Sequence, residues 1–393
     1  TAFIYEEGKI SRAKGAWFET VVCCIIAVFC SLSQGAVPDL GFFGKDEANC
    51  RETAFCGMMS LSDAEEIIKS AAEYASGSCT FLFQGGEPTL AGLDFYKGFA
   101  EIEKKYAKKG LIFHHSIQTN GLLIDDDWAE FFKKNNYLVG LSLDGPAQIN
   151  DLNRVDVSGK GTFNRVIKAA DALDRQGAAY NVLSVVTGKN ARSAEKIYNF
   201  LKKQGFRYLQ FIPCLEPFSS ERGESAYSLS PKDYAEFLVK IFNLWLSDLL
   251  KGNYISIRHI DNQLSVMLGR PPEMCSAFGC CNIQYVIEAD KSVYPCDFYV
   301  LDGYKIGEIG KNTFEEMRNS ETAVKFIKDS QNVPDECKAC PFYCVCRNGC
   351  RRDRSSENGI IGKNYYCDSY KYYYAKCNAG CIKARSCLNQ NKR

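Results

Sequence analysis

Cysteines in the last third of the chain are the feature that most restricts how it can fold. Eight of them follow a regular pattern, and these are Cys275, Cys281, Cys296, Cys337, Cys340, Cys346, Cys350 and Cys367. Cys280 and Cys344 lie beside them as extra cysteines. Short Cys-x2-Cys steps let neighbouring thiolates reach one metal centre, and a cubane iron–sulfur cluster takes four thiolates. The pattern therefore favours two such clusters.

Zinc sites and disulfides are also compatible with a cysteine-rich sequence. Zinc favours the same soft ligands and fits one Cys-x2-Cys pair well, but a single four-cysteine zinc site leaves many cysteines unexplained. Disulfides stabilise small secreted domains that are short of hydrophobic core, whereas a chain of 393 residues is long enough to build one. Iron–sulfur clusters are the interpretation that uses all the regularly spaced cysteines.

Charge and composition limit the classes of partner. The chain has 48 basic and 47 acidic residues, and its net charge of +1 provides no basic field for nucleic acid or an anionic membrane surface. Apolar residues make up 46% of the chain, which is enough for large cores. Twenty cysteines and only 3 histidines indicate thiolate-bound metal in a reducing compartment, and we expect a cytoplasmic protein.

Short apolar runs alternate with amphipathic stretches from about residue 79. The apolar runs predict strands at Cys79–Phe83, Leu111–Ile117, Tyr137–Leu143, Tyr180–Thr187 and Tyr208–Pro213. The stretches between them predict helices such as Asp94–Lys108, Phe163–Gln176 and Ala191–Lys203. Repeated βα units of roughly 30 residues imply parallel strands covered by helices, as an open sheet or a barrel. With the apolar run near Val21, this α/β fold has six strands.

The apolar run Val21–Cys30 has two interpretations. Basic residues precede it and Ser33–Ala36 follows it, which is the order of a secretory signal peptide. A buried parallel strand looks the same, because it is also short, continuous and β-branched. The run is too short to span a bilayer. Export would expose cluster thiolates to oxidation, and we therefore expect a strand.

Polar motifs follow three of the predicted strands. Gln84–Pro88 follows the first of them, Gln118–Gly121 the second and Ser142–Pro146 the third. Active sites of parallel α/β folds lie at the carboxyl ends of the strands, so these motifs predict a ligand site. Glu87 is suited to accept hydrogen bonds from an amine. Each motif alone is also typical of a turn, and Arg154, shortly after, is typical of the surface.

A hairpin is predicted for Gln284–Tyr294, where two β-rich runs flank an Asp-Lys turn. The hairpin carries Cys296 and Asp297 out together. A partly buried carboxylate can have its pKa raised toward neutrality, so Asp297 is a candidate general base. A turn aspartate that caps the backbone of Phe298 is the other interpretation.

Two helical segments flank the cysteine-rich region. Pro231–Gly252 predicts a long helix whose apolar positions belong to a core. The tail after Cys367 is tyrosine-rich and then basic, and it holds Cys377, Cys381 and Cys387. We expect a frayed, solvated helix end there, with metal binding by these three cysteines as the alternative.

Taken together in this order, the motifs resemble the anaerobic sulfatase-maturating enzymes, radical S-adenosylmethionine proteins with a C-terminal twitch and SPASM iron–sulfur domain. The resemblance rests on Gln84–Gly92, Gln118–Gly121, Gly140–Pro146, Leu152–Arg154, Tyr294–Tyr299 and the Cys337–Cys350 pattern. It implies a partial (β/α)6 barrel over residues 42–262 and a small cysteine-rich twitch and SPASM domain over 263–375. An atypical segment at 1–41 and a basic tail at 376–393 would flank them.

The resemblance also implies roles for individual residues. One auxiliary [4Fe–4S] cluster would be held by Cys275, Cys281, Cys296 and Cys350, and a second by Cys337, Cys340, Cys346 and Cys367. S-adenosylmethionine would contact Gly86, Ser142, Arg154 and Leu215, with Glu87 beside its amino group. Asp297 would deprotonate the substrate. Cys280 and Cys344 have no counterpart in this pattern.

The implied reaction converts a cysteine or serine in an unfolded sulfatase segment to formylglycine. A 5′-deoxyadenosyl radical would take hydrogen from the side-chain Cβ while Asp297 removes the thiol or hydroxyl proton, and the surplus electron would leave through the auxiliary clusters. The implied partners are a Cys/Ser-x-Pro-x-Arg peptide and an electron donor such as ferredoxin or flavodoxin. Neither nucleic acid nor a membrane is expected as a partner.

One departure from the family pattern concerns a third cluster, which should bind S-adenosylmethionine. The family holds it with Cys-x3-Cys-x2-Cys, and the corresponding positions here are Gly35, Asp39 and Phe42. The nearest cysteines do not supply three thiolates at suitable spacings, and they are Cys23, Cys24 and Cys30.

This departure has two competing interpretations. In the first, residues 1 to about 41 come from a misread or recombined reading frame. In the second, the chain is a non-catalytic iron–sulfur protein that binds peptides or transfers electrons. The first is favoured, because a chain that had abandoned catalysis has little reason to keep Asp297 together with the cofactor motifs. A related SPASM peptide maturase is the alternative within the enzymes.

Overall fold

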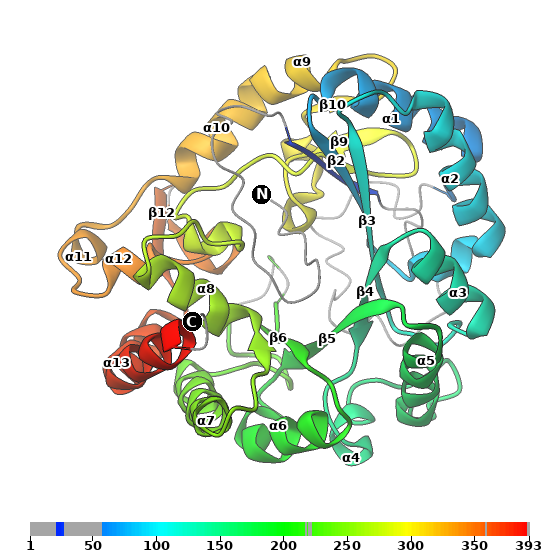
Figure 1. Ribbon diagram of the computed structural model, residues 1–393. Helices are drawn as coiled ribbons and strands as arrows, with labels where there is room; N and C mark the ends of the chain where they lie inside the picture. The colour runs from blue at the N-terminus through cyan, green and yellow to red at the C-terminus, as the bar shows by residue number, and fades with distance from the viewer. Residues whose placement is uncertain (1–20, 27–56, 217, 219–221, 358–359, 391–393) are drawn as a thin grey trace.

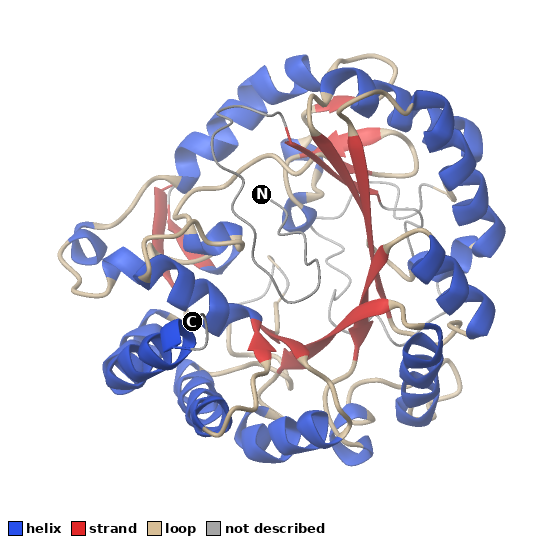
Figure 2. Ribbon diagram, viewed as in Figure 1, coloured by secondary structure: helices blue, strands red, loops and turns tan. Residues whose placement is uncertain are grey.

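The computed structural model describes residues 21–26, 57–216, 218, 222–357 and 360–390 (Figure 1). A curved sheet forms the inner layer, and helices surround it on the outside (Figure 2). The strands are β1 (Val21–Ile26), β2 (Ser78–Phe83), β3 (Ile112–Thr119), β4 (Tyr137–Ser142), β5 (Ala179–Val186), β6 (Tyr208–Pro213), β7 (Ser256–Ile257), β8 (Val286–Ile287), β9 (Ser292–Tyr294), β10 (Gly307–Glu308), β11 (Arg354–Glu357) and β12 (Ile360–Asn364).

Helices occupy most of the connections between these strands. They are α1 (Leu61–Tyr74), α2 (Leu93–Tyr106), α3 (Asp126–Lys134), α4 (Ala147–Asn150), α5 (Phe163–Gln176), α6 (Ala194–Lys203), α7 (Pro231–Leu250), α8 (Arg258–Met267), α9 (Phe314–Asn319), α10 (Glu321–Ser330), α11 (Asp335–Lys338), α12 (Tyr343–Cys346) and α13 (Cys367–Gln390).

The main sheet has the order β10-β9-β8-β1-β2-β3-β4-β5-β6-β7, and β1 to β7 all run parallel to their neighbours. The predicted α/β fold with six parallel strands, β1 to β6, is confirmed, and β7 adds a short seventh. The strand interpretation of the apolar run near Val21 is also confirmed, because Val21–Ile26 forms β1 between β2 and β8.

Alternating burial along a strand explains the two layers. In β2, Cys79, Phe81 and Phe83 are fully buried, whereas the residues between them are half-buried. Phe81 and Phe83 meet Phe99 of α2 edge-on, with ring centroids 5.2 and 5.1 Å apart. Successive side chains of a strand point to opposite faces, so the half-buried residues line the inside of the barrel. The aromatic layer between sheet and helices is the main hydrophobic core.

The long helix α7 belongs to this core as predicted. Phe237, Ile241 and Trp245 are buried on one of its faces. Trp245 Nε1 also donates to the carbonyl of Ile255 at 2.8 Å, which satisfies the polar atom of a buried indole.

The cysteine-rich region continues the barrel sheet. The predicted hairpin is present as β8 and β9, which are antiparallel, and β10 pairs with β9. β8 in turn pairs parallel with β1, so the hairpin is an extension of the barrel sheet. This pairing brings the residues after β9 to the barrel edge formed by β1 and β2.

The prediction of a frayed, solvated end is wrong for the first part of the tail. Cys377 and Cys381 lie within α13 and are buried. Gln263 Nε2 donates to the sulfur of Cys381 at 3.3 Å, and α13 packs on α7. Gly380 allows this close approach, since a Cβ added there would lie 2.5 Å from Phe242 Cε1. This part of α13 therefore belongs to the core.

Among the described residues, no helix is both long and apolar enough to cross a membrane.

The docking of α13 on α7 can be tested at Gly380. Replacing Gly380 with leucine forces a side chain against Phe242, which is buried and cannot move aside freely. Overpacking of this kind costs about 1–3 kcal/mol. We expect that loss in urea unfolding followed by tryptophan fluorescence. The matched control is Ala379→Leu on the exposed side of the same helix, with a change within about 0.5 kcal/mol. Equal effects of the two substitutions would mean that α13 is not docked.

Candidate active site and cysteine clusters

The four cysteines of the first expected set come from separate segments and influence one another electrostatically. Cys275 begins a short 3-10 helix, Cys296 follows β9, and Cys350 lies between α12 and β11. Burial, and then the neighbouring Cys281, raises the pKa of Cys275. Burial is also the largest cause of the raised pKa of Cys350, with Cys275 and Cys281 adding to it. The structure therefore brings this set together.

The second set lines one pocket. Its members are Cys337, Cys340, Cys346 and Cys367, and they share the pocket with aromatic residues that include Phe342 and Tyr370. Burial, followed by smaller contributions that include the other three cysteines of the set, raises the pKa of Cys346 to about 11. The structure therefore brings the second set together as well.

The donor atoms of both sets fit iron–sulfur clusters in kind and number. Each set offers four thiols, and all eight of these cysteines are free of disulfides. No three His, Cys, Asp or Glu side chains of the described residues are close enough to hold a single metal ion. A cubane binds its ligands through irons at separate corners, so its cysteines lie farther apart than those around one ion. Because burial raises the pKa of these thiols, cluster binding must release their protons.

The two extra cysteines differ from these sets in their surroundings. Cys344 is exposed, and Cys280 is half-buried beside Cys281. Neither lines the pocket of the second set.

Asp297 lies at the junction between the first cysteine set and the barrel. Its Oδ2 accepts a hydrogen bond from Gln84 Nε2 at 2.8 Å, and its Oδ1 accepts one from the thiol of Cys296 at 3.2 Å. Gln84 directly follows β2, so the carboxylate faces the carboxyl end of a barrel strand. The structure gives the Asp297 side chain these partners instead of the capping contact to Phe298, which was the other interpretation. The sequence offered a signal for Gln84, which is the first residue of the motif after β2.

The loop after β2 needs glycines. Gly85 and Gly86 have φ values of 91° and 54°, in the region that side chains with a Cβ rarely adopt. This turn directs Glu87 toward the neighbouring loop, where its carboxylate is buried. Four donors from the two loops satisfy it: Thr89 N at 3.0 Å, Thr89 Oγ1 at 2.5 Å, Thr119 Oγ1 at 2.7 Å and Asn120 N at 2.8 Å. Glu87 therefore ties the carboxyl ends of β2 and β3 together.

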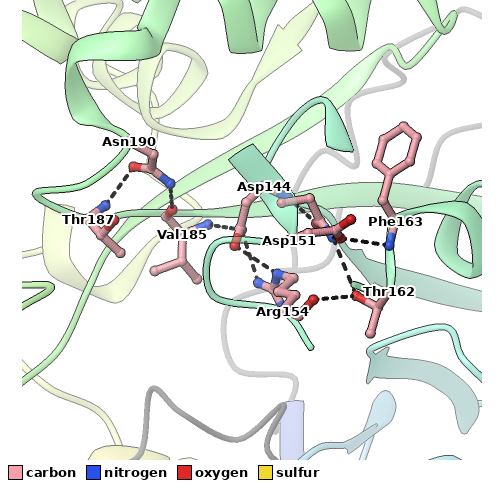
Figure 3. Close-up of polar contacts among 9 residues, drawn as sticks. Asp144, Asp151, Arg154, Thr162, Phe163, Val185, Thr187 and Asn190 are labelled. Atoms are coloured by element: carbon pink, nitrogen blue, oxygen red, sulfur yellow. Dashed lines mark hydrogen bonds and ion pairs between the residues drawn. The ribbon is translucent and has the colours of Figure 1, made fainter. Parts of the chain in front are cut away.

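Ser142, Arg154 and Leu215 lie at the same edge of the sheet. Ser142 is the last residue of β4, and Leu215 follows β6 by two residues. Arg154 is 7% exposed, so its interpretation as a surface residue is wrong. The physical reason is an ion pair: Arg154 Nε and Nη2 donate to the two carboxylate oxygens of Asp144 at 2.8 and 3.0 Å (Figure 3).

Asp144 connects Arg154 to the ends of two strands. Its Oδ1 also accepts from the backbone N–H of Val185 at 2.8 Å (Figure 3). Its own N–H donates to Asn150 Oδ1 at 3.1 Å. Sequence reasoning did not single out Asp144, although it lies within the polar motif after β4. A bidentate, buried pair of this kind fixes the guanidinium in orientation as well as position.

Comparison with known proteins identifies the family. A model described as "Radical SAM superfamily" matches residues 23–201, and one described as "Iron-sulfur cluster-binding domain" (SPASM) matches residues 279–341. The cysteine-type anaerobic sulfatase-maturating enzyme of Clostridium novyi is 48% identical over 336 residues, which cover 85% of this chain and 90% of that relative. The chain belongs to the anaerobic sulfatase-maturating enzymes.

Further relatives of this family agree. A serine-type anaerobic sulfatase-maturating enzyme of Bacteroides thetaiotaomicron is 35% identical over 311 residues, covering 75% of this chain and 74% of that protein. The solved structure described as "Native anSMEcpe with bound AdoMet and Cp18Cys peptide" has a TM-score of 0.87 at 40% identity, covering 94% of this chain and 99% of that one.

As a member of the anaerobic sulfatase-maturating enzymes, the chain is an enzyme that acts on a protein residue. Its cofactors are [4Fe–4S] clusters and S-adenosylmethionine. The iron–sulfur interpretation is thereby confirmed over zinc and disulfides, and the enzyme interpretation over a non-catalytic protein. The positions that correspond to the family's Cys-x3-Cys-x2-Cys motif, and Cys30, lie outside the described residues.

The buried pair in this maturating enzyme is expected to contribute far more to stability than an exposed one. Asp144→Ala leaves a guanidinium buried beside an empty carboxylate site, and breaking a buried pair costs about 3–5 kcal/mol. The matched control is Asp126→Ala, which removes an ion pair to Arg175 whose side chains are both 56% exposed. An exposed pair contributes at most about 1 kcal/mol. Urea unfolding of both variants measures the difference, and similar losses would contradict the structural role of Asp144.

Proposed function

We infer that this chain oxidises a cysteine or serine in an unfolded segment of a sulfatase to formylglycine. The observation that carries the proposal is the position of Asp297, which links the first cysteine set to the carboxyl end of β2. A base at that edge can reach a peptide side chain presented over the barrel, while the cysteine beside it belongs to an electron acceptor. The name of the relatives and the bound peptide of the solved structure support the same substrate class.

Asp297 is proposed as the base that removes the thiol or hydroxyl proton. Gln84 fixes one of its oxygens by donating to Oδ2. The other oxygen, Oδ1, accepts from the thiol of Cys296. When Cys296 becomes a thiolate ligand, it loses the proton that it donates, and Oδ1 is then available for the substrate proton. Cluster assembly and base activation are in this way coupled through neighbouring residues.

The edge formed by Gly86, Ser142, Arg154 and Leu215 is proposed to bind S-adenosylmethionine. Gly86 offers backbone without a side chain, and Arg154 offers a cation held by Asp144. Glu87 is proposed beside the amino group, because its Oε2 accepts from Asn120 N and has a second acceptor site for an ammonium donor. Its Oε1, which accepts from Thr89 and Thr119, holds the loops after β2 and β3 in place. When bound, the cofactors supply the radical and electron-transfer chemistry.

The remaining assignments complete the proposal. Cys275, Cys281, Cys296 and Cys350 would hold the first auxiliary cluster, and Cys337, Cys340, Cys346 and Cys367 the second. The substrate would be a Cys/Ser-x-Pro-x-Arg peptide, and ferredoxin or flavodoxin would donate electrons. A cytoplasmic location would keep the thiolates reduced. The barrel would span residues 42–262, and the twitch and SPASM region residues 263–375.

The ligand assignment predicts that each cluster can be removed separately. After anaerobic reconstitution we expect the two cysteine sets to hold about eight irons per chain, because a cubane contains four irons and binds four cysteines. A cluster that binds S-adenosylmethionine would add about four more. Cys350→Ser should abolish the first cluster and Cys337→Ser the second, each lowering the iron content by about four. Cys344→Ser, at an exposed cysteine outside both sets, is the matched control and should keep full iron content. Equal iron loss in all three variants would refute the assignment.

The catalytic role of Asp297 predicts a loss of turnover without a loss of clusters. Incubation of the reconstituted chain with a Cys-x-Pro-x-Arg peptide should give the formylglycine mass change and release 5′-deoxyadenosine. Asp297→Asn should slow product formation about 10²- to 10⁴-fold, as expected for a lost general base. Asp302→Asn, at a nearby exposed aspartate, should leave the rate unchanged.

Two outcomes of this assay would contradict the proposal in different ways. Iron-loaded protein that never cleaves S-adenosylmethionine would show that this chain lacks the reaction. Cofactor cleavage with a different mass change in the peptide would instead indicate a related SPASM peptide maturase.

A further inference from the structure

Two buried arginines lie beside the first cysteine set and have no part in the reaction described so far. Arg351 and Arg354 follow Cys350 closely in the chain, and each is 8% exposed. Arginine is rarely buried to this extent unless a negative charge compensates it. The residues around the two guanidinium groups therefore show whether carboxylates compensate their positive charges.

Arg354 is surrounded by backbone carbonyl groups. It donates to the carbonyl oxygens of Ser330 at 2.5 Å, Asn348 at 3.1 Å and Gly349 at 2.8 Å. Within the described part of the chain, no carboxylate lies at ion-pair distance from it. Carbonyl dipoles satisfy its N–H groups but carry no net charge. The buried carboxylate of Asp353, the preceding residue, is ion-paired with Arg222 and therefore offsets only part of the positive charge here.

Arg351 is enclosed by aromatic rings. Its guanidinium lies 4.4 Å from the ring centroid of Phe326 and 5.1 Å from that of Tyr299, and its Nη1 donates to the carbonyl of Phe326 at 2.7 Å. The nearest carboxylate is that of Asp329, which is 3.9 Å away and partly exposed. Tyr299 ends the short helix that begins at Asp297. Arg351 thus lies directly behind the segment that carries the proposed base.

Both arginines act on the first cysteine set. The backbone N–H of Cys281 donates to Ser330 Oγ at 2.8 Å, and the carbonyl of the same serine accepts from Arg354. Arg351 directly follows Cys350 in the chain, and its guanidinium packs on the ring of Tyr299, three residues after Cys296. The guanidinium groups thus favour negative charge at this set.

The second set has a different kind of compensation. The cations near the second set are lysines: Lys371 lines its pocket, and Lys363 lies four residues before Cys367 in the chain. The side chain of Lys363 is 40% exposed, and Lys371 is half-buried. Exposed charges are screened by water and salt, whereas buried ones are screened much less. The two sets therefore differ in the strength of the positive field that they feel.

We propose that Arg354 and Arg351 are fixed counter-charges for the iron–sulfur cluster of the first set, and that they raise its reduction potential. A cubane with four thiolate ligands is negatively charged, and reduction adds one more electron to it. A buried cation stabilises the reduced form more than the oxidised form. The electron that enters is the surplus electron from substrate oxidation, so the arginines favour its acceptance. This inference rests on the proposed ligand assignment.

The test is an electron paramagnetic resonance redox titration of the full chain after anaerobic reconstitution. Arg354→Gln keeps hydrogen-bond donors but removes the charge. We expect the equilibrium constant for reduction of the first cluster to fall about tenfold, which is a shift of about 59 mV for a one-electron couple. Arg354→Lys keeps the charge and should restore most of the potential. The second cluster is an internal control, and Cys337→Ser shows which signal belongs to it.

A matched control addresses the exposed cations. Lys371→Gln should leave the first cluster unchanged and affect only the second, with a shift that disappears at high salt. The shift caused by Arg354→Gln should instead persist at high salt, because the guanidinium is buried.

The outcomes that would overturn the inference are distinct from those that would overturn the proposed function. Wild-type chain that fails to assemble two clusters would refute the ligand assignment before any potential is measured. Two assembled clusters with an unchanged first potential in both Arg354→Gln and Arg351→Gln would refute the counter-charge role alone. Loss of the first cluster in Arg354→Gln and Arg354→Lys alike would show that Arg354 holds the backbone. In that case, an unchanged reduction potential of the first cluster in Arg351→Gln would also refute the counter-charge role of Arg351.

Discussion

The parallel pairing of β1 with both β2 and β8 is the constraint on which the site depends. β8 contributes only two residues, Val286 and Ile287, yet they place the whole β8–β9 hairpin beside the barrel strands. The chain then leaves β9 at Tyr294 and reaches Cys296 and Asp297 within three residues. Without this pairing, the hydrogen bond from Gln84 to Asp297, which joins residues 213 positions apart, has no reason to form.

The regular part of the fold was accessible from the sequence. β2 to β6 and α2, α5 and α7 lie within two residues of their predicted bounds, because long apolar runs and amphipathic stretches alternate there. β7 was missed because two residues carry no periodicity. β8 was expected as part of the hairpin, but its parallel pairing with β1 was not. The buried part of α13 was missed because its polar residues suggested solvent. There, Gly380 decides the packing through a close approach to Phe242 that has no signature in the sequence.

The sequence indicated where the candidate residues lie in the fold, but not which partners they contact. Motif order indicated Glu87, Arg154 and Asp297, and all of these lie at or near the carboxyl edge of the sheet. Their partners depend on strand register, which brings Thr119 to Glu87 and Val185 to Asp144. A charged residue read in isolation resembles a surface residue. Arg154 is buried because Asp144 compensates it, and this compensation is a property of the folded loop.

The proposed proton acceptor and the proposed cluster ligand beside it are neighbours in the chain, so covalent structure fixes their separation. Asp297, proposed to take the proton, is bonded directly to Cys296, proposed to ligate the cluster that takes the electron. Movement of the loops above the barrel therefore cannot separate the two functions. The field of Arg351 reaches the same segment through Tyr299. The short stretch Cys296–Tyr299 thus contains the proposed base, a proposed cluster ligand and an aromatic ring that packs on the buried Arg351. A displacement of any one of these groups therefore displaces the others.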